Sequence, residues 1–185
     1  LIPSKLKAQE ITIKLNPEKV YVIKSNSQQI VNSDFYLEST SKDTLHLTKL
    51  EVKLMDANNN LLMQKFMSIN GISPSILTIP DRTLIKGKTL CVFNPFHTFD
   101  ADIPVTSFEF KFTLTKSDGK TSFDKTIKVA PTNTPTKTKQ ILPIQHALTL
   151  IQDGNDFYAH HRRVDLSSFP VQMFNVTRHG NRYAY

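Results

Sequence analysis

Apolar and polar residues alternate along most of the chain up to about Pro131, and many of the apolar ones are β-branched or aromatic. A period of two is typical of a strand with one face in a core and the other in solvent. No segment with helical periodicity interrupts this pattern. The predicted strands are Glu10 to Leu15, Val20 to Ile23, Gln29 to Ser39, Leu45 to Met55, Leu61 to Ser68, Ser75 to Ile79, Thr89 to Phe93, Thr106 to Lys116 and Thr121 to Val129.

Two short connectors between these strands carry turn residues. The Asn-rich stretch from Asp56 to Asn60 tolerates left-handed backbone, and the pair Asp118-Gly119 is typical of a tight hairpin turn. A series of strands at roughly 8 to 14 residues each, without helices between them, favours a sandwich over an α/β fold. The sequence therefore predicts an all-β protein with an immunoglobulin-like β-sandwich.

A change of composition after Pro131 predicts a domain boundary. Residues 132–139 are rich in Thr, Pro and Lys, which is typical of an extended linker. Residues 140–185 then contain four of the six histidines, four arginines and no lysine. We therefore expect a sandwich over residues 1–131, a linker over 132–139 and a short, mostly extended C-terminal segment over 140–185.

Composition narrows the class of protein. The chain has 185 residues, of which 39% are hydrophobic and 21% charged, and its 12 phenylalanines can fill a core. No apolar run reaches the roughly 18 to 20 residues of a membrane-spanning helix, so no transmembrane segment is expected. The chain begins at Leu1, which predicts a processed chain whose targeting signal has been removed.

A single cysteine, Cys91, excludes an intrachain disulfide. We interpret it as a buried structural thiol, because free cysteine is among the most buried residue types. A nucleophilic cysteine would need a histidine that lowers its pKa, and His97 is near Cys91 only in sequence.

The net charge of +7 raises the question of an anionic partner. The lysines are scattered, and many alternate with apolar residues, as in the stretch from Phe108 to Phe112. This arrangement is typical of the solvated face of a strand. No basic run with interleaved aromatics is present, so no nucleic-acid partner is expected. Attraction to an anionic surface, such as a bacterial envelope, is the alternative.

Within the sandwich, the sequence predicts no catalytic group. Asp34 and Glu38 share the face of one strand, and we interpret them as solvated carboxylates rather than a catalytic pair. His46 and His97 are isolated in sequence and are interpreted as structural.

The C-terminal segment concentrates polar residues of the kind that bind metals or each other. On a strand, His160 and His161 would point to opposite faces, so at most one of them could enter a given site. Zinc needs three or four converging ligands, and a polar cluster with Asp–Arg pairs is the alternative. The members of this expected structural cluster are Asp156, His160, His161, Arg162, Arg163 and Asp165.

Three blocks of this segment carry a resemblance to a known family. They are Ile141 to Pro143, Asp153 to Arg163, and Asn181 to Tyr185. In this order they look like the opening of a lysostaphin/LytM-type zinc metallopeptidase domain, and members of that family often carry an N-terminal β-sandwich. The resemblance covers about 46 residues. It implies that residues 140–185 are the incomplete start of a peptidase-like β domain.

The resemblance also implies a metal. In a full enzyme of this class, zinc polarises the scissile carbonyl and activates water. His179 is the metal-ligand candidate that the resemblance supplies. The chain ends at Tyr185, one residue before the aspartate of the family's pattern, and the later His-x-His is absent. Zinc is therefore expected in the full-length parent, and none in this chain.

Three functions follow as hypotheses. In the first, the chain is the non-catalytic positioning region of a secreted or periplasmic bacterial zinc metallopeptidase, with a cell-wall peptide or another envelope protein as partner. In the second, it is a non-enzymatic immunoglobulin-like module that binds a protein or a glycan. In the third, which the scattered lysines support least, it is a basic domain that adheres to anionic polymers.

Overall fold

The computed structural model describes residues 11–24, 27–31, 33–72, 74–79 and 81–132, and the backbone of 178–179 and 182–183. Its elements are β1 (Ile11–Asn16), β2 (Val22–Lys24), β3 (Gln28–Val31), β4 (Asp34–Ser39), β5 (Leu45–Met55), β6 (Leu61–Ser68), η1 (Ile76–Thr78), β7 (Thr83–Leu84), β8 (Leu90–Val92), β9 (Thr98–Asp100), β10 (Ser107–Lys116), β11 (Ser122–Val129), β12 (Arg178–His179) and β13 (Arg182–Tyr183).

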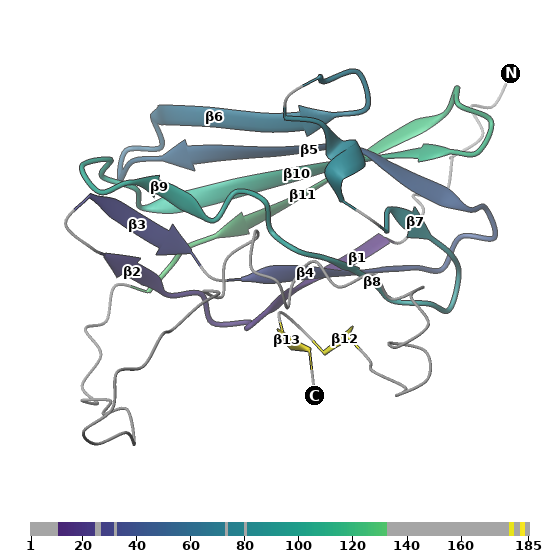
Figure 1. Ribbon diagram of the computed structural model, residues 1–185, viewed down its shortest axis with the longest axis horizontal. Helices are drawn as coiled ribbons and strands as arrows, with labels where there is room; N and C mark the ends of the chain where they lie inside the picture. Colours follow the sequence, from purple (N-terminus) through teal and green to yellow (C-terminus); the bar gives the residue numbers. More distant parts are fainter. Residues whose placement is uncertain are drawn as a thin grey trace, which may run out of the picture.

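The strands form two facing layers (Figure 1). One layer has the order β11-β10-β5-β6, with β7 pairing the start of β5, and the other has the order β1-β4-β8. All of these pairings are antiparallel. In immunoglobulin terms the first layer is G-F-C with an added C′ strand, and the second is A-B-E. The fold is all-β, as the sequence predicts.

Aromatic residues join the two layers. The Phe35 ring on β4 meets Phe110 and Phe112 on β10 edge to face, at centroid distances of 4.9 and 5.0 Å. The three side chains are essentially inaccessible to solvent. Each buries a large apolar area, and the edge-to-face geometry adds a favourable quadrupole interaction. They form the centre of the core.

A third, small sheet extends the second layer. Its order is β2-β3-β9, and it packs on the first layer where the rings of Phe99 and Phe108 lie 5.6 Å apart. The sequence predicts one strand from Gln29 to Ser39, whereas the structure divides it into β3 and β4. The division positions a buried polar network, in which Asp34 accepts a hydrogen bond from the Asn94 backbone at 2.9 Å.

A β-bulge shifts the phase of β5. Its register with β10 shifts between Thr113 and Leu114, because Thr48 is an extra residue on the β5 side. Before the bulge, the odd-numbered Leu45 and Leu47 point inward, and after it the even-numbered Leu50, Val52 and Leu54 do. The bulge therefore places Lys49 and Glu51 together on the outer face of the sheet.

Both predicted hairpin turns are confirmed. In the β5–β6 turn, the Asp56 side chain bonds the Asn60 side chain and backbone, and these bonds lower the pKa of Asp56. In the β10–β11 turn, Gly119 has a φ of 70°, a region that favours glycine. Backbone N–H groups of Thr121 and Lys120 bond the Asp118 side chain and lower its pKa.

One predicted strand is wrong. The predicted strand Ser75 to Ile79 contains the short 3-10 helix η1, Ile76–Thr78, which is capped by the Ser75 side chain. Ile76 and Ile79 are buried and three residues apart, which is the spacing of one face of a 3-10 helix. The strands β7 and β9, of two and three residues, are absent from the sequence prediction.

The predicted boundary after Pro131 falls at the end of the described sandwich. Thr132, the first residue of the expected linker, still belongs to the fold, since its backbone N–H donates to Val20 O at 2.8 Å. It forms a parallel bridge with Tyr21. Residues 133–139 lie outside the described residues, so the linker and the division into domains remain predictions.

Candidate functional site

The C-terminal candidates lie almost entirely outside the described residues. This holds for every member of the expected polar cluster: Asp156, His160, His161, Arg162, Arg163 and Asp165. The backbone of His179 lies in β12, where it pairs with Arg182 of β13. The His179 side chain is outside the described set, so its role as a zinc ligand remains a prediction.

The two carboxylates of β4 have different surroundings. The interpretation of Asp34 as solvated is wrong, because its side chain is fully buried against the segment that contains Asn94. Glu38 is partly exposed, accepts a hydrogen bond from the Thr89 hydroxyl at 3.1 Å and lies 3.6 Å from Lys14 Nζ. Asp34 thus has a structural role, since its bond satisfies a buried backbone donor.

The histidines and the cysteine of the sandwich are dispersed. A ring nitrogen of His97, which is buried, lies 3.2 Å from Asn94 O, and His46 lies 3.1 Å from the Ser117 hydroxyl. These contacts agree with structural roles. The expectation that Cys91 is buried is wrong, because the side chain lies on the outer face of β8 and is partly exposed.

The outer face of the β11-β10-β5-β6 sheet carries a network of ion pairs. Every acid in it has a lysine within 4.0 Å across or along the strands. The pairs are Lys49–Glu51 at 2.7 Å, Lys53–Glu51 at 3.9 Å, Lys53–Glu109 at 3.8 Å, Lys128–Glu109 at 3.6 Å and Lys111–Asp124 at 3.5 Å. These lysines lie on a solvated strand face, as their alternation predicts.

Glu51 is the unusual member of this network, because its side chain is only 4% exposed although it points to the outer face. Burial on its own raises the pKa of Glu51. The hydrogen bond from Lys49 and the charges of Lys49, Lys111 and Lys53 outweigh this effect, so the pKa lies below its ordinary 4.5. Lys49 also lies 5.0 Å from the ring centroid of Phe66, the cross-strand neighbour of Glu51.

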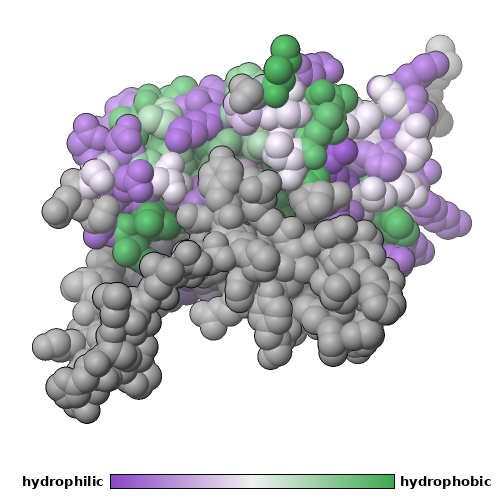
Figure 2. Space-filling view, in the orientation of Figure 1, coloured by the Kyte–Doolittle hydropathy of each residue, from purple (hydrophilic) through white to green (hydrophobic). Residues whose placement is uncertain are grey.

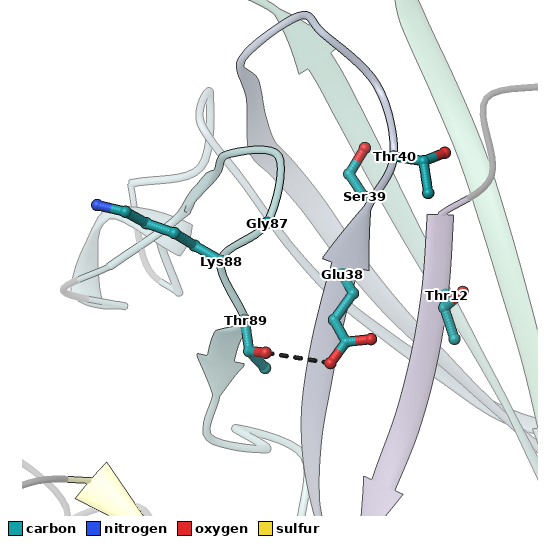
Figure 3. A pocket seen from close by; sticks show the side chains of 7 residues that line it. All are labelled: Thr12, Glu38, Ser39, Thr40, Gly87, Lys88 and Thr89. Carbon is teal, nitrogen blue, oxygen red and sulfur yellow. Dashed lines mark hydrogen bonds between the residues drawn. The ribbon is translucent and has the colours of Figure 1, made fainter.

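A polar pocket of about 240 Å³ lies on the outer face of the β1-β4-β8 sheet (Figure 3). In the figure, Glu38 faces Thr89 across the pocket, and Lys88 points away from the other side chains. Its lining residues are Thr12, Glu38, Ser39, Thr40, Gly87, Lys88 and Thr89. This set offers hydroxyls, one carboxylate and the Lys88 ammonium for hydrogen bonding, and it contains neither histidine nor cysteine.

Exposed apolar side chains concentrate along the edge strand β6 and the segment that follows it. We call Leu62, Phe66, Ile69, Ile72 and Leu77 the apolar rim; their exposed fractions run from 37% to 98%. Figure 2 shows apolar residues gathered along the upper edge of the molecule, in the region of β6 and η1. Residues 69–80 contain no charged side chain at all. Exposed apolar surface of this kind marks interaction sites.

Backbone contacts fix the shape of the rim. A parallel bridge joins Ser68 to Ser75, so the end of β6 and the start of η1 lie side by side. A Cβ at Gly71 would come within 2.6 Å of the Pro74 carbonyl oxygen, so the turn between them requires glycine. These contacts constrain the backbone where β6 ends and η1 begins.

The part of the chain that the structure describes contains neither a metal-binding cluster nor a membrane-spanning helix. No three or more His, Cys, Asp and Glu residues there are grouped as they would be around a metal ion. No helix among those residues is long and apolar enough to cross a membrane. Among the described residues, the exposed side chains of the apolar rim make it the strongest candidate for a binding surface.

Comparisons with known proteins assign the chain to no family. No family model and no curated protein matches it. It is similar to the solved structure of structural genomics target SoR45, with a TM-score of 0.43 at 12% identity over 74% of this chain and 96% of that one. It is also similar to target BeR40 from Bordetella pertussis, provisionally assigned as an ApaA protein, with 0.42 at 11% identity over 68% and 97%.

Proposed function

We propose that the described domain is a non-catalytic immunoglobulin-like module that binds a protein partner through the apolar rim. The observation that carries the proposal is the exposure of Ile72 and Leu77, at 98% and 60%, in a segment without charges. Burying exposed apolar surface gains roughly 25 cal/mol per Å², which supplies a driving force for association.

The neighbourhood of the rim favours a protein over an anionic membrane. Phe66 belongs both to the rim and to the outer face of the sheet, where it adjoins the Lys49–Glu51 pair. Among the described residues of that face, lysines and acids are paired, so these residues form no cluster of unpaired cations beside the rim. An apolar centre beside mixed charges is the usual anatomy of a protein interface, whereas adhesion to anionic lipid relies on several clustered cations.

The test uses peptides selected from a random phage-displayed library on the immobilised chain, resynthesised and titrated by calorimetry. The variant Ile72→Lys/Leu77→Lys places two charges in the rim without disturbing the core. We expect its affinity for the selected peptides to fall at least tenfold, about 1.4 kcal/mol, because central apolar contacts dominate such interfaces.

The matched control is Ile23→Lys, which adds a charge at a residue that is about as exposed as Leu77, at 58% against 60%, but lies on β2 outside the rim. Its affinity should equal that of the wild-type chain. Selected peptides that bind the rim variant as tightly as the wild type would refute the proposal. So would rim-dependent binding to phosphatidylglycerol vesicles without any peptide binding, which would identify a lipid surface instead.

The second candidate is the positioning region of a zinc metallopeptidase that acts on cell-wall peptides. The resemblance of residues 153–163 and 181–185 to the lysostaphin/LytM type supports it. In this proposal the parent protein is secreted or periplasmic, and the rim contacts either the remainder of that protein or another envelope protein. The zinc belongs to the parent, with His179 as a ligand.

We expect no stoichiometric zinc in the 185-residue chain. His179 with one of His160 or His161 would supply two imidazoles, which leaves half of a tetrahedral site to water. Elemental analysis after dialysis against zinc-containing buffer should give well under one zinc per chain. One zinc per chain, lost in His179→Ala, would contradict this expectation and would show that the segment holds a site.

A further inference from the structure

The two layers of the sandwich leave a groove along one side. There β1 and β11 are the edge strands of opposite sheets, since β1 pairs with β4 and β11 with β10. Within the described ranges, no strand pairs with the outer edge of either one. A cavity of about 550 Å³ lies between them, lined by Ile13, Lys14, Leu15, Glu18, Ile127 and Lys128.

The floor of this groove is apolar. Ile13 and Leu15 on β1 and Ile127 on β11 are half-buried and pack against the core, so their outer surfaces face the groove. Two of them are alternate residues of one strand. Side chains at every second position of an extended peptide would meet such a floor, because they point to one side.

One end of the groove is closed by the protein's own backbone. Beyond β1 and β11 the two edges converge, and Tyr21 and Thr132 form a parallel bridge with the Thr132 N–H on Val20 O. The same two chain edges therefore pair directly at this end and are separated by a cavity along Ile13 to Leu15. A further strand can fill that separation and continue the pairing.

The charges at the groove select its occupant. The side chains of Lys14 and Lys128 are 62% and 79% exposed, and each forms only a long ion pair, Lys14 with Glu38 and Lys128 with Glu109, both at 3.6 Å. The lining contains these two lysines and one acid, Glu18, and Lys125 follows on the same face of β11 as Ile127. Edge lysines repel a second copy of this cationic chain and attract an acidic peptide.

From these features we infer that the groove between β1 and β11 binds an extended, acidic peptide segment of a partner protein by β-strand addition. Backbone groups of the peptide pair with the outer edge of β11, which no described strand occupies, its alternate apolar side chains cover Ile13, Leu15 and Ile127, and its carboxylates meet Lys14 and Lys128. Main-chain pairing supplies affinity in this mode, and the alternating side chains supply specificity. This site is separate from the apolar rim.

The test titrates the chain with the peptide acetyl-EVTVEVTV-amide and follows backbone amide NMR signals. We expect saturable shifts at Ile13, Leu15, Ile127 and Lys128, and slower hydrogen exchange along β11. The matched peptide acetyl-KVTVKVTV-amide should bind at least about tenfold more weakly, because its charges are repelled. Lys14→Glu/Lys128→Glu should reverse this preference, whereas Lys120→Glu, in the β10–β11 turn, should leave it unchanged.

Three results would overturn the inference. They are the absence of saturation up to about 1 mM acidic peptide, shifts that map to the apolar rim, and equal binding of the two peptides. The rim variant Ile72→Lys/Leu77→Lys should bind the acidic peptide like the wild type, so the failure of one proposal leaves the other standing.

Discussion

Replacing Phe35 by Ala should lower the free energy of unfolding by about 3 to 5 kcal/mol. Phe35 is completely buried, and its ring contacts Phe110 and Phe112 on the opposite sheet. Truncation therefore removes apolar contacts with both rings and leaves a cavity between the layers. Because domains of this size are stable by roughly 5 to 15 kcal/mol, the loss is a large share of the total.

Urea titration followed by circular dichroism measures this loss as a lower midpoint with an unchanged slope. The matched control is Phe66→Ala, which removes the same side chain from a position that is 53% exposed. It should cost well under about 1 kcal/mol, because surface substitutions have small effects. Equal losses for the two variants would show that the layers are not held together at Phe35.

Replacing Glu51 by Gln should cost about 1 to 3 kcal/mol at neutral pH. The buried carboxylate accepts a 2.7 Å hydrogen bond from Lys49 and lies among the charges of Lys53 and Lys111. Glutamine keeps the shape but removes the negative charge, so the lysines are left to repel each other. Glu109→Gln, at the more exposed and longer pairs of the same face, should cost about 0 to 1 kcal/mol.

The effect at Glu51 should depend on pH in a fixed direction. Its pKa is lowered in the folded protein, so its contribution is fully present above the ordinary value of 4.5. The contribution is lost as the pH falls through the lower folded-state pKa. The stability difference between the wild type and Glu51→Gln should therefore shrink in acid. A difference that stays constant from neutral pH down to about pH 2 would contradict the assigned ion pairs.

The long strands could be predicted from the sequence because alternation alone determines them. The predicted bounds of β5 and β6 coincide with those observed, and those of β10 and β11 differ by one residue. The wrong prediction lies where apolar residues recur every third residue rather than every second one. Between Pro74 and Pro80, Ile76 and Ile79 are buried three residues apart, a 3-10 spacing that we interpreted as alternation.

The β5 bulge can be recognised in the sequence. Leu45 and Leu47 occupy odd positions, whereas Leu50, Val52 and Leu54 occupy even ones, and this change of phase marks the extra residue. The burial of Asp34 cannot be recognised in this way, because the segment that covers it lies 60 residues further along the chain. Contacts at such separations depend on strand order, which alternation does not determine.

The candidate surfaces differ in how far the sequence could reveal them. The lack of charge over residues 69–80 is visible in the sequence and could have indicated the apolar rim. The groove could not be found in this way, because Leu15 and Ile127 come together only through the arrangement of the two sheets. The residues that carry the peptidase resemblance lie outside the described ranges, so the resemblance remains a prediction.

The strand order also constrains the sequence of events during synthesis. The strand β10 lies at the centre of its layer, between β5 and β11, and it supplies the Phe110 and Phe112 rings. A nascent chain can close the local β5–β6 hairpin early. The pairing of β5 with β10 forms later, because paired residues such as Lys49 of β5 and Thr113 of β10 are far apart in the chain. Until β10 has left the ribosome, Phe35 lacks the two rings that it contacts on the opposite sheet, Phe110 and Phe112. Premature termination before β10 therefore yields an aggregation-prone product, whatever surfaces the finished domain uses.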